Sequence, residues 1–241
     1  MKKLPIGIQS FDKIRSADFY YVDKTRYVHE LTQKGQYYFL SRPRRFGKSL
    51  FLDTLKQAFT GKKEYFTGLF LEHHWDWDVC YPVINLSFGT GVIKKTADLE
   101  TIIISLMDEI AQNYDVKIDG ELLSLRFREL IIKLYNQHQR QVVILIDEYD
   151  KPILDNIENP DLARDIREGL KNFYSVIKDC DRYLKFVFIT GISKFSKVSL
   201  FSVLNNLDDI TLDQDCASIC GYTHDELSLT FADRLQGVDI Q

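Results

Sequence analysis

The stretch that decides the fold spans residues 37–61 and reads YYFLSRPRRFGKSLFLDTLKQAFTG. Its first four residues, YYFL, form a short apolar run that predicts a buried strand. The loop that follows ends in Gly47-Lys48-Ser49. Apolar residues then recur at helical spacing, and Gly61 is expected to end that helix. A strand, a loop ending in Gly-Lys-Ser and a helix, in that order, are the local context of a phosphate-binding loop.

The chemistry of such a loop explains these residue types. Backbone N–H groups before the helix converge on phosphate oxygens, and the helix N-terminus adds positive potential. Gly47 would let the backbone approach closely, Lys48 would reach the β- and γ-phosphates, and the Ser49 hydroxyl would ligate Mg²⁺. The predicted nucleotide contacts of the loop are Arg44, Arg45, Phe46, Gly47, Lys48, Ser49 and Leu50, and Lys48 is also a candidate catalytic residue.

The loop departs from the common pattern G-x-x-x-x-G-K-[ST] at its start. Arg42 stands where the first glycine would be, and Pro43 removes one backbone donor. The alternative interpretation is a basic turn before an ordinary helix, whose arginines are solvated or contact an acidic partner.

A second apolar run, residues 142–146, delivers Asp147 and Glu148 at its end. Ligands bind at the carboxyl edge of open α/β sheets, where Asp147 would orient Mg²⁺ and Glu148 would polarise the attacking water. Solvated acids at a strand end are the alternative. Asp150 and Lys151 follow; either could serve the site, but a solvent-facing turn stopped by Pro152 is the expectation for them.

A further strand, residues 184–189, ends in Thr190, Gly191, Ile192 and Ser193. Thr190 and Ser193 are catalytic candidates, because a polar residue here would lie beside the γ-phosphate and sense hydrolysis. Lys194 and Lys197 would add positive charge at the same edge. The alternative is a plain turn in which Ser193 caps a helix.

The remaining pattern alternates strands and helices. We predict a strand over 82–88, helices over 99–114, 121–139 and 161–178, and a short strand over 209–212. This predicts an α/β P-loop NTPase fold with a parallel sheet of about five strands covered by helices on both faces.

Composition limits the function classes. The chain has 241 residues, 45% of them hydrophobic, and a formal net charge of −4, which argues against a general nucleic-acid coat. The first residues lack the apolar run of a signal peptide, and no apolar run is long enough to span a membrane, so a cytoplasmic location is expected. The four cysteines are expected to be reduced and mostly buried; the spacing of Cys216 and Cys220 alone is a weak indication of zinc.

Near the end of the chain, Thr223 is a plausible N-cap and Glu226 completes a capping box. We therefore predict an ATPase domain over 1–220 and the start of a truncated helical segment over 221–241. Residues 20–25, with Asp23 and Lys24 as candidate cofactor contacts, are predicted to pack beside the base or ribose, because they precede the strand that feeds the loop.

Together these regions resemble a known family. The motifs YYVDKT (20–25), SRPRRFGKS (41–49), YPVINLSF (81–88), IDEYDKP (146–152), TGISKFSK (190–197) and GYTHDEL (221–227) resemble the predicted AAA-ATPase-like family of bacterial proteins. The resemblance implies an ATPase core of the additional-strand type, with the strand that carries Asp147 beside the central one. It also implies that members often carry a C-terminal nuclease-like domain of the PD-(D/E)XK type, which is not expected within these 241 residues.

We expect an ATP- and Mg²⁺-binding module, most simply an ATPase acting as a regulatory or motor domain. The alternatives are a switch that hydrolyses ATP slowly or not at all, a module handling nucleic acid with the missing nuclease-like domain, and a small-molecule kinase. A GTPase is disfavoured because no N-K-x-D motif occurs. Arg164, Arg167 and Arg182 are candidate arginine fingers, with Arg44 or Arg45 as the rival source of charge, and the isolated chain is expected to hydrolyse ATP poorly.

Overall fold

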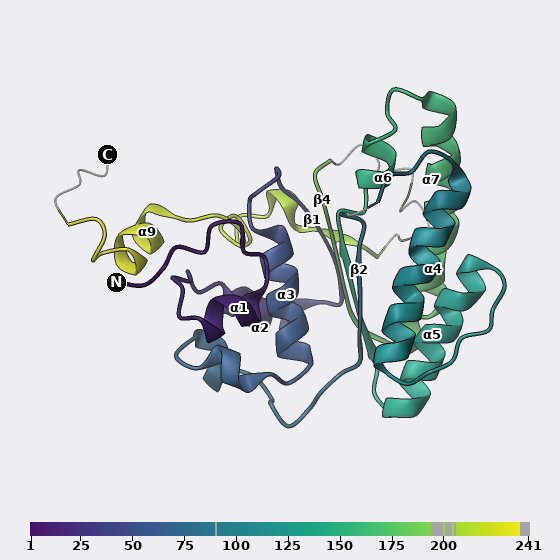
Figure 1. Cartoon of the computed structure of the whole chain (residues 1–241). Helices are drawn as coiled ribbons and strands as arrows, with labels where there is room; N and C mark the ends of the chain where they lie inside the picture. Colours follow the sequence, from purple (N-terminus) through teal and green to yellow (C-terminus); the bar gives the residue numbers. More distant parts are fainter. Residues whose placement is uncertain (90, 194–199, 201–203, 205, 237–241) are drawn as a thin grey trace. The chain divides into compact units, whose positions relative to one another are not determined.

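Five parallel strands form one sheet in the order β2-β3-β4-β1-β5 (Figure 1). The computed structural model describes residues 1–241 except 90, 194–199, 201–203, 205 and 237–241. The strands are β1 Tyr37–Ser41, β2 Val83–Ser87, β3 Val142–Asp147, β4 Leu184–Gly191 and β5 Asp208–Asp209. The predicted α/β fold with a parallel sheet of about five strands is therefore confirmed.

The strand register brings the polar strand ends to one edge of the sheet. Every residue of β1 and β3 is buried, as their unbroken apolar runs predicted. Ser41 pairs with Gly191 across β1 and β4, and Ser87 pairs with Asp147 across β2 and β3. Because β4 lies between β1 and β3, the ends of the first and third strands flank the end of the fourth.

Contacts within the chain divide it into two units. The sheet unit comprises Gln36–Pro43 and Tyr81–Thr211, and the loop unit comprises Met1–Gly35, Arg44–Cys80 and Leu212–Gln241. The whole sheet belongs to the sheet unit. The predicted boundary at residue 220 falls inside the loop unit.

Three long helices of the sheet unit, α4, α5 and α7, lie on one face of the sheet (Figure 1). They span α4 Thr96–Asn113, α5 Leu123–His138 and α7 Pro160–Asp179, close to the predicted ranges. The short α6 Lys151–Leu154 and η3 Asp181–Tyr183 belong to the same unit. Phe127 and Phe173 stack between α5 and α7 with ring centroids 4.4 Å apart. A helical layer on the other face stays a prediction.

The fifth strand is shorter and lies earlier than predicted. Only Asp208 and Asp209 pair with β1, and residues Ile210–Leu212 form the 3-10 turn η4. The Asp209 carboxylate accepts the backbone N–H of Thr211 at 3.0 Å. This local bond favours a turn over continued strand pairing.

The loop unit is built from α1 Phe11–Ser16, α2 Thr25–Lys34, α3 Lys48–Phe59, η1 Lys63–Phe66, η2 Phe70–His73 and α9 His224–Thr230. The Phe11 backbone N–H donates to Asp53 at 2.7 Å and thereby ties α1 to α3. The predicted capping box of Thr223 and Glu226 is present at the start of α9. In the part of the chain that the structure describes, no helix is long and apolar enough to cross a bilayer.

Candidate functional site

The phosphate loop leaves β1 through a loop with two left-handed residues. Arg45 has φ 65° and Gly47 has φ 95°, and Gly47 is the N-cap of α3. Lys48, the first helical residue, is only 6% exposed. Since a glycine N-cap offers no side-chain acceptor, the first N–H groups of α3 receive no N-cap side chain. Such a helix start attracts anions.

Arg42 has a structural role that the sequence did not reveal. Its Nη1 donates to the carbonyl oxygens of Thr211 at 2.5 Å and Ser41 at 3.1 Å. The Ser41 backbone N–H donates to the Thr211 hydroxyl at 3.0 Å. The residue in place of the usual first glycine therefore ties the end of β1 to the turn after β5, within the sheet unit.

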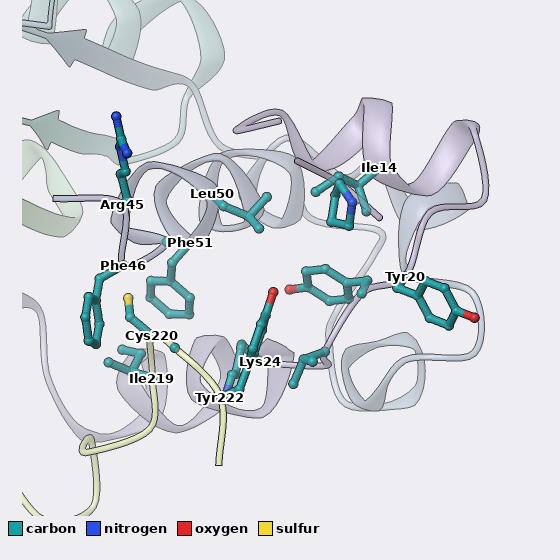
Figure 2. Close-up of a pocket in the computed structure, with 15 residues that line it drawn as sticks. Ile14, Tyr20, Lys24, Arg45, Phe46, Leu50, Phe51, Ile219, Cys220 and Tyr222 are labelled. Carbon is teal, nitrogen blue, oxygen red and sulfur yellow. The ribbon is translucent and has the colours of Figure 1, made fainter. Parts of the chain in front are cut away.

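A cavity of about 290 Å³ adjoins the phosphate loop within the loop unit (Figure 2). This volume is close to the lower end of the range for small-molecule pockets, about 300–1,000 Å³. Its lining is largely apolar and aromatic: Pro5, Ile14, Tyr20, Tyr21, Val22, Lys24, Arg45, Phe46, Gly47, Leu50, Phe51, Ile219, Cys220, Gly221 and Tyr222. Figure 2 shows the Arg45 guanidinium pointing away from the space enclosed by Phe51 and Tyr222. A flat aromatic ligand suits such a lining.

The segment 20–25 is divided between the cavity and a structural junction. Lys24 lines the cavity and is 7% exposed. Asp23 is not among the lining residues. Its carboxylate accepts the backbone N–H groups of Thr25 at 2.8 Å and Phe70 at 2.7 Å. Of the two predicted cofactor contacts, the structure brings Lys24 to the cavity and places Asp23 between α2 and η2.

The wall formed by residues 219–222 was missing from the predicted site. It leads into α9, whose Glu226 receives both hydrogen bonds of the Lys24 ammonium, each 2.6 Å long. Burial alone would raise the pKa of Glu226, but Lys24 and the backbone N–H of Thr223 lower it below its ordinary value. The only signal in the sequence was the motif at 221–227, which gave no role to these residues.

The acidic strand end lies in the sheet unit. The Thr190 hydroxyl donates to Asp147 Oδ1 at 2.5 Å, and both residues are buried. Glu148 has φ 55°, and its carboxylate oxygen would lie 3.2 Å from a Cβ added at Gly89. The structure thus brings Asp147 and Thr190 together and places Glu148 on a left-handed turn beside them.

The expectation of a solvent-facing turn at Asp150 is wrong. Asp150 is fully buried, and its carboxylate accepts the backbone N–H groups of Ile192 at 3.1 Å and Ser193 at 2.7 Å. These donors belong to the chain after β4, which a sequence reading could not place next to residue 150. Lys151 forms an ion pair with Asp155 on α6. The predicted residues Lys194 and Lys197 lie outside the described residues.

The candidate arginine fingers occupy different places in the sheet unit. Arg182 precedes the amino end of β4, at the opposite end of that strand from Thr190, and its guanidinium lies 4.9 Å from the Tyr183 ring centroid. Arg164 and Arg167 line a groove on α7 together with Ser193. Arg164 also forms an ion pair with Asp161 at 3.2 Å.

Metal ligands are sparse. In the described ranges no group of three or more His, Cys, Asp or Glu residues could hold a metal ion. All four cysteines are free thiols, three of them buried, and burial raises the pKa of Cys216 to about 11. An Mg²⁺ ion bound with a nucleotide needs only one or two protein oxygens besides phosphate and water. In the sheet unit, the buried Asp147 carboxylate offers one such oxygen.

Comparisons with known proteins identify the family of the chain. A protein of Azotobacter chroococcum mcd 1, described as "Uncharacterized protein in vnfD 5'region", is 52% identical over 239 residues, which are 99% of this chain and 46% of that protein. The chain therefore spans less than half the length of this curated relative. No solved structure matches. The sequence model described as Predicted AAA-ATPase matches residues 5–201, and the chain belongs to this family.

Proposed function

We propose that the chain is a Mg²⁺-dependent ATPase module. The observation that carries this proposal is the start of α3, where the left-handed Gly47 leads a helix that has no N-cap side chain and adjoins an aromatic cavity. Membership of the predicted AAA-ATPase family supports nucleotide binding. The strand order, with β4 between β1 and β3, supports the additional-strand type.

The residues divide the work between binding and chemistry. The cavity takes the base, the start of α3 takes the phosphates, and Lys48 neutralises the β- and γ-phosphates. Ser49 of the loop unit and Asp147 of the sheet unit are the predicted Mg²⁺ ligands, and the ion would supply charge neutralisation on the phosphates. Glu148 accepts the proton of the attacking water. Thr190 fixes the Asp147 carboxylate through its hydroxyl.

The module acts, we propose, as the regulatory or motor part of a larger protein. The length of the Azotobacter relative, of which this chain covers 46%, supports such an arrangement. A C-terminal nuclease-like domain, and through it nucleic acid, is the partner class that the family resemblance implies.

Glu148→Gln tests the catalytic assignment. The carboxamide keeps the shape of the side chain but is a much weaker base, so the variant should bind Mg-ATP within about twofold of the parent and lose most turnover. Calorimetry measures binding and phosphate release measures turnover. Glu158→Gln, at an exposed position on the same unit, is the matched control. Equal turnover in the Glu148 variant and the parent would remove Glu148 from the mechanism, and no binding of ATP by the parent would overturn the function itself.

A further inference from the structure

Asp150 joins the turn after β3 to the segment after β4, and we propose that it is a positioning residue for hydrolysis. This inference rests on the proposed ATPase function. In it, Asp150 holds Ile192 and Ser193, directly after the end of β4, so that Thr190 keeps its bond to Asp147 beside Glu148. Asp150 itself does not touch the nucleotide in this scheme.

The Asp150 carboxylate binds the backbone just beyond the strand ladders. Pairing of β4 with β3 ends at Ile189, and its pairing with β1 ends at Gly191, so neither ladder includes the two residues that follow. Asp150 Oδ2 accepts from the N–H groups of both, Ile192 at 3.1 Å and Ser193 at 2.7 Å. Burying a carboxylate costs free energy unless hydrogen-bond donors satisfy it. The buried Asp150 carboxylate therefore needs these two backbone N–H groups, and they need it as their acceptor.

Tyr149 reinforces the same junction. Its backbone N–H donates to the Thr190 carbonyl at 3.0 Å, and its hydroxyl donates to the Ser193 carbonyl at 2.7 Å. A Cβ added at Gly191 would lie 2.3 Å from the Tyr149 ring and 2.8 Å from Asp150 Oδ1. The two segments therefore meet too closely for any side chain at residue 191, which fixes their relative position.

The chemistry explains why this position matters. The Thr190 hydroxyl is 2.5 Å from Asp147 Oδ1, and a displacement of about 1 Å at such a site can cost about 100-fold in rate. Loss of the Asp150 bonds frees Ile192 and Ser193 and loosens the end of β4, without removing any group that the proposed mechanism assigns to nucleotide binding. Turnover should fall while affinity stays.

The test compares Asp150→Ala with Asp150→Asn. Alanine removes the acceptor, so turnover at saturating Mg-ATP should fall about tenfold or more, the Kd for ATP should stay within about twofold, and amide exchange at Ile192 and Ser193 should speed up. The oxygen of asparagine, in the position of Oδ2, can accept from both N–H groups, so this variant should recover most of the turnover and protection. Asp155→Asn, an exposed acid on the neighbouring segment, is the control and should change neither.

Two outcomes overturn the proposal. One is unchanged amide exchange at Ile192 and Ser193 in Asp150→Ala; the other is a loss of turnover in Asp150→Asn as large as in the alanine variant, which would mean that the charge itself acts. If Asp150→Ala fails to fold, Tyr149→Phe removes the hydroxyl that donates to the Ser193 carbonyl. This variant should shift exchange and turnover in the same direction by less, and no shift in exchange would overturn the proposal. Exchange is measured without nucleotide, so it tests the junction even if the parent proves to have no ATPase activity.

Discussion

Gly47 and Arg45 carry the phosphate loop through two left-handed backbone conformations. For Gly47 this conformation costs nothing, because glycine has no Cβ. The loop therefore depends on backbone geometry as well as on the charge of Lys48.

Gly47→Ala tests that dependence. Nothing lies within 4 Å of the added Cβ, so the substitution acts through backbone strain, which is on the order of 1–2 kcal/mol in this conformation. We expect the affinity for ATP, measured by calorimetry, to fall about tenfold. Gly169→Ala is the matched control, since Gly169 lies inside α7, also with nothing within 4 Å and without positive φ, and should keep parental affinity. Parental affinity in the Gly47 variant would contradict the role of the loop backbone.

Single residues were predictable only where local sequence fixes their chemistry. Gly-Lys-Ser before a helix and Asp-Glu after an apolar strand both stand out in the sequence. The bond from Thr190 to Asp147 and the burial of Asp150 depend on which strands are neighbours, which the sequence around each residue does not contain. For Asp23, the sequence suggested a ligand contact but not the backbone N–H groups of Thr25 and Phe70 that its carboxylate accepts.

Among the elements, α9 fixes the cavity wall through one ion pair. Lys24 and Glu226 are 9% and 26% exposed at their side chains, so solvent screens the pair only partly. Glu226 is not a lining residue, which separates its effect on the wall from direct contact with a ligand.

Glu226→Gln should weaken ATP binding about three- to tenfold, because the ion pair with Lys24 that holds the wall at 219–222 is lost. Asp225→Asn, an exposed acid in the same turn of α9, should bind like the parent. Since the pKa of Glu226 is lowered in the folded protein, its stabilising contribution is present above the unfolded pKa, about 4.3, and is lost as pH falls through the folded value. Thermal unfolding from pH 7 to pH 3 should therefore show a smaller fall of Tm in the glutamine variant; identical pH profiles would show that the pair contributes nothing.

Elements followed from hydrophobic periodicity wherever the apolar run was long. The strands β1 and β3 and the helices α4, α5 and α7 appear within a few residues of the predicted limits. The short β5 could not be located in the same way, because two aspartates carry no apolar pattern and the competing turn at Ile210–Leu212 is set by a local side-chain bond.

At the scale of the whole molecule, both tryptophans report on one unit. Trp75 packs against Phe59 at 5.3 Å and Trp77 against Phe66 at 4.9 Å between ring centroids, all in the loop unit, and the chain has no other tryptophan. Their fluorescence follows the unfolding of the unit that holds the cavity.

Mg-ATP should raise the unfolding midpoint seen by tryptophan fluorescence. A ligand at 100 times its Kd adds about 2.7 kcal/mol to the free energy of unfolding of the state that binds it. Lys48→Ala should lose most of this shift, because the charge on the β- and γ-phosphates is gone. A shift of equal size in the variant would place the nucleotide elsewhere.

The composition of the units could not be inferred from order along the chain. The loop unit gathers three separate stretches, and its last stretch starts at Leu212, before the boundary predicted at residue 220. Apolar periodicity identifies elements but does not say which of them pack together, and the contacts of Tyr20 with Phe231, whose ring centroids are 5.0 Å apart, join residues from the two ends of the chain.

At residue 148, the left-handed backbone favours a different residue type from the one that the proposed chemistry requires. Glycine or asparagine would occupy this conformation with less strain, by on the order of 1 kcal/mol, yet neither has the carboxylate at the same reach. Selection for heat resistance alone would therefore drive the position away from glutamate, whereas selection for turnover would keep it. Without selection for turnover, variants of this protein should therefore become more stable and less active, with residue 148 among the first positions to change.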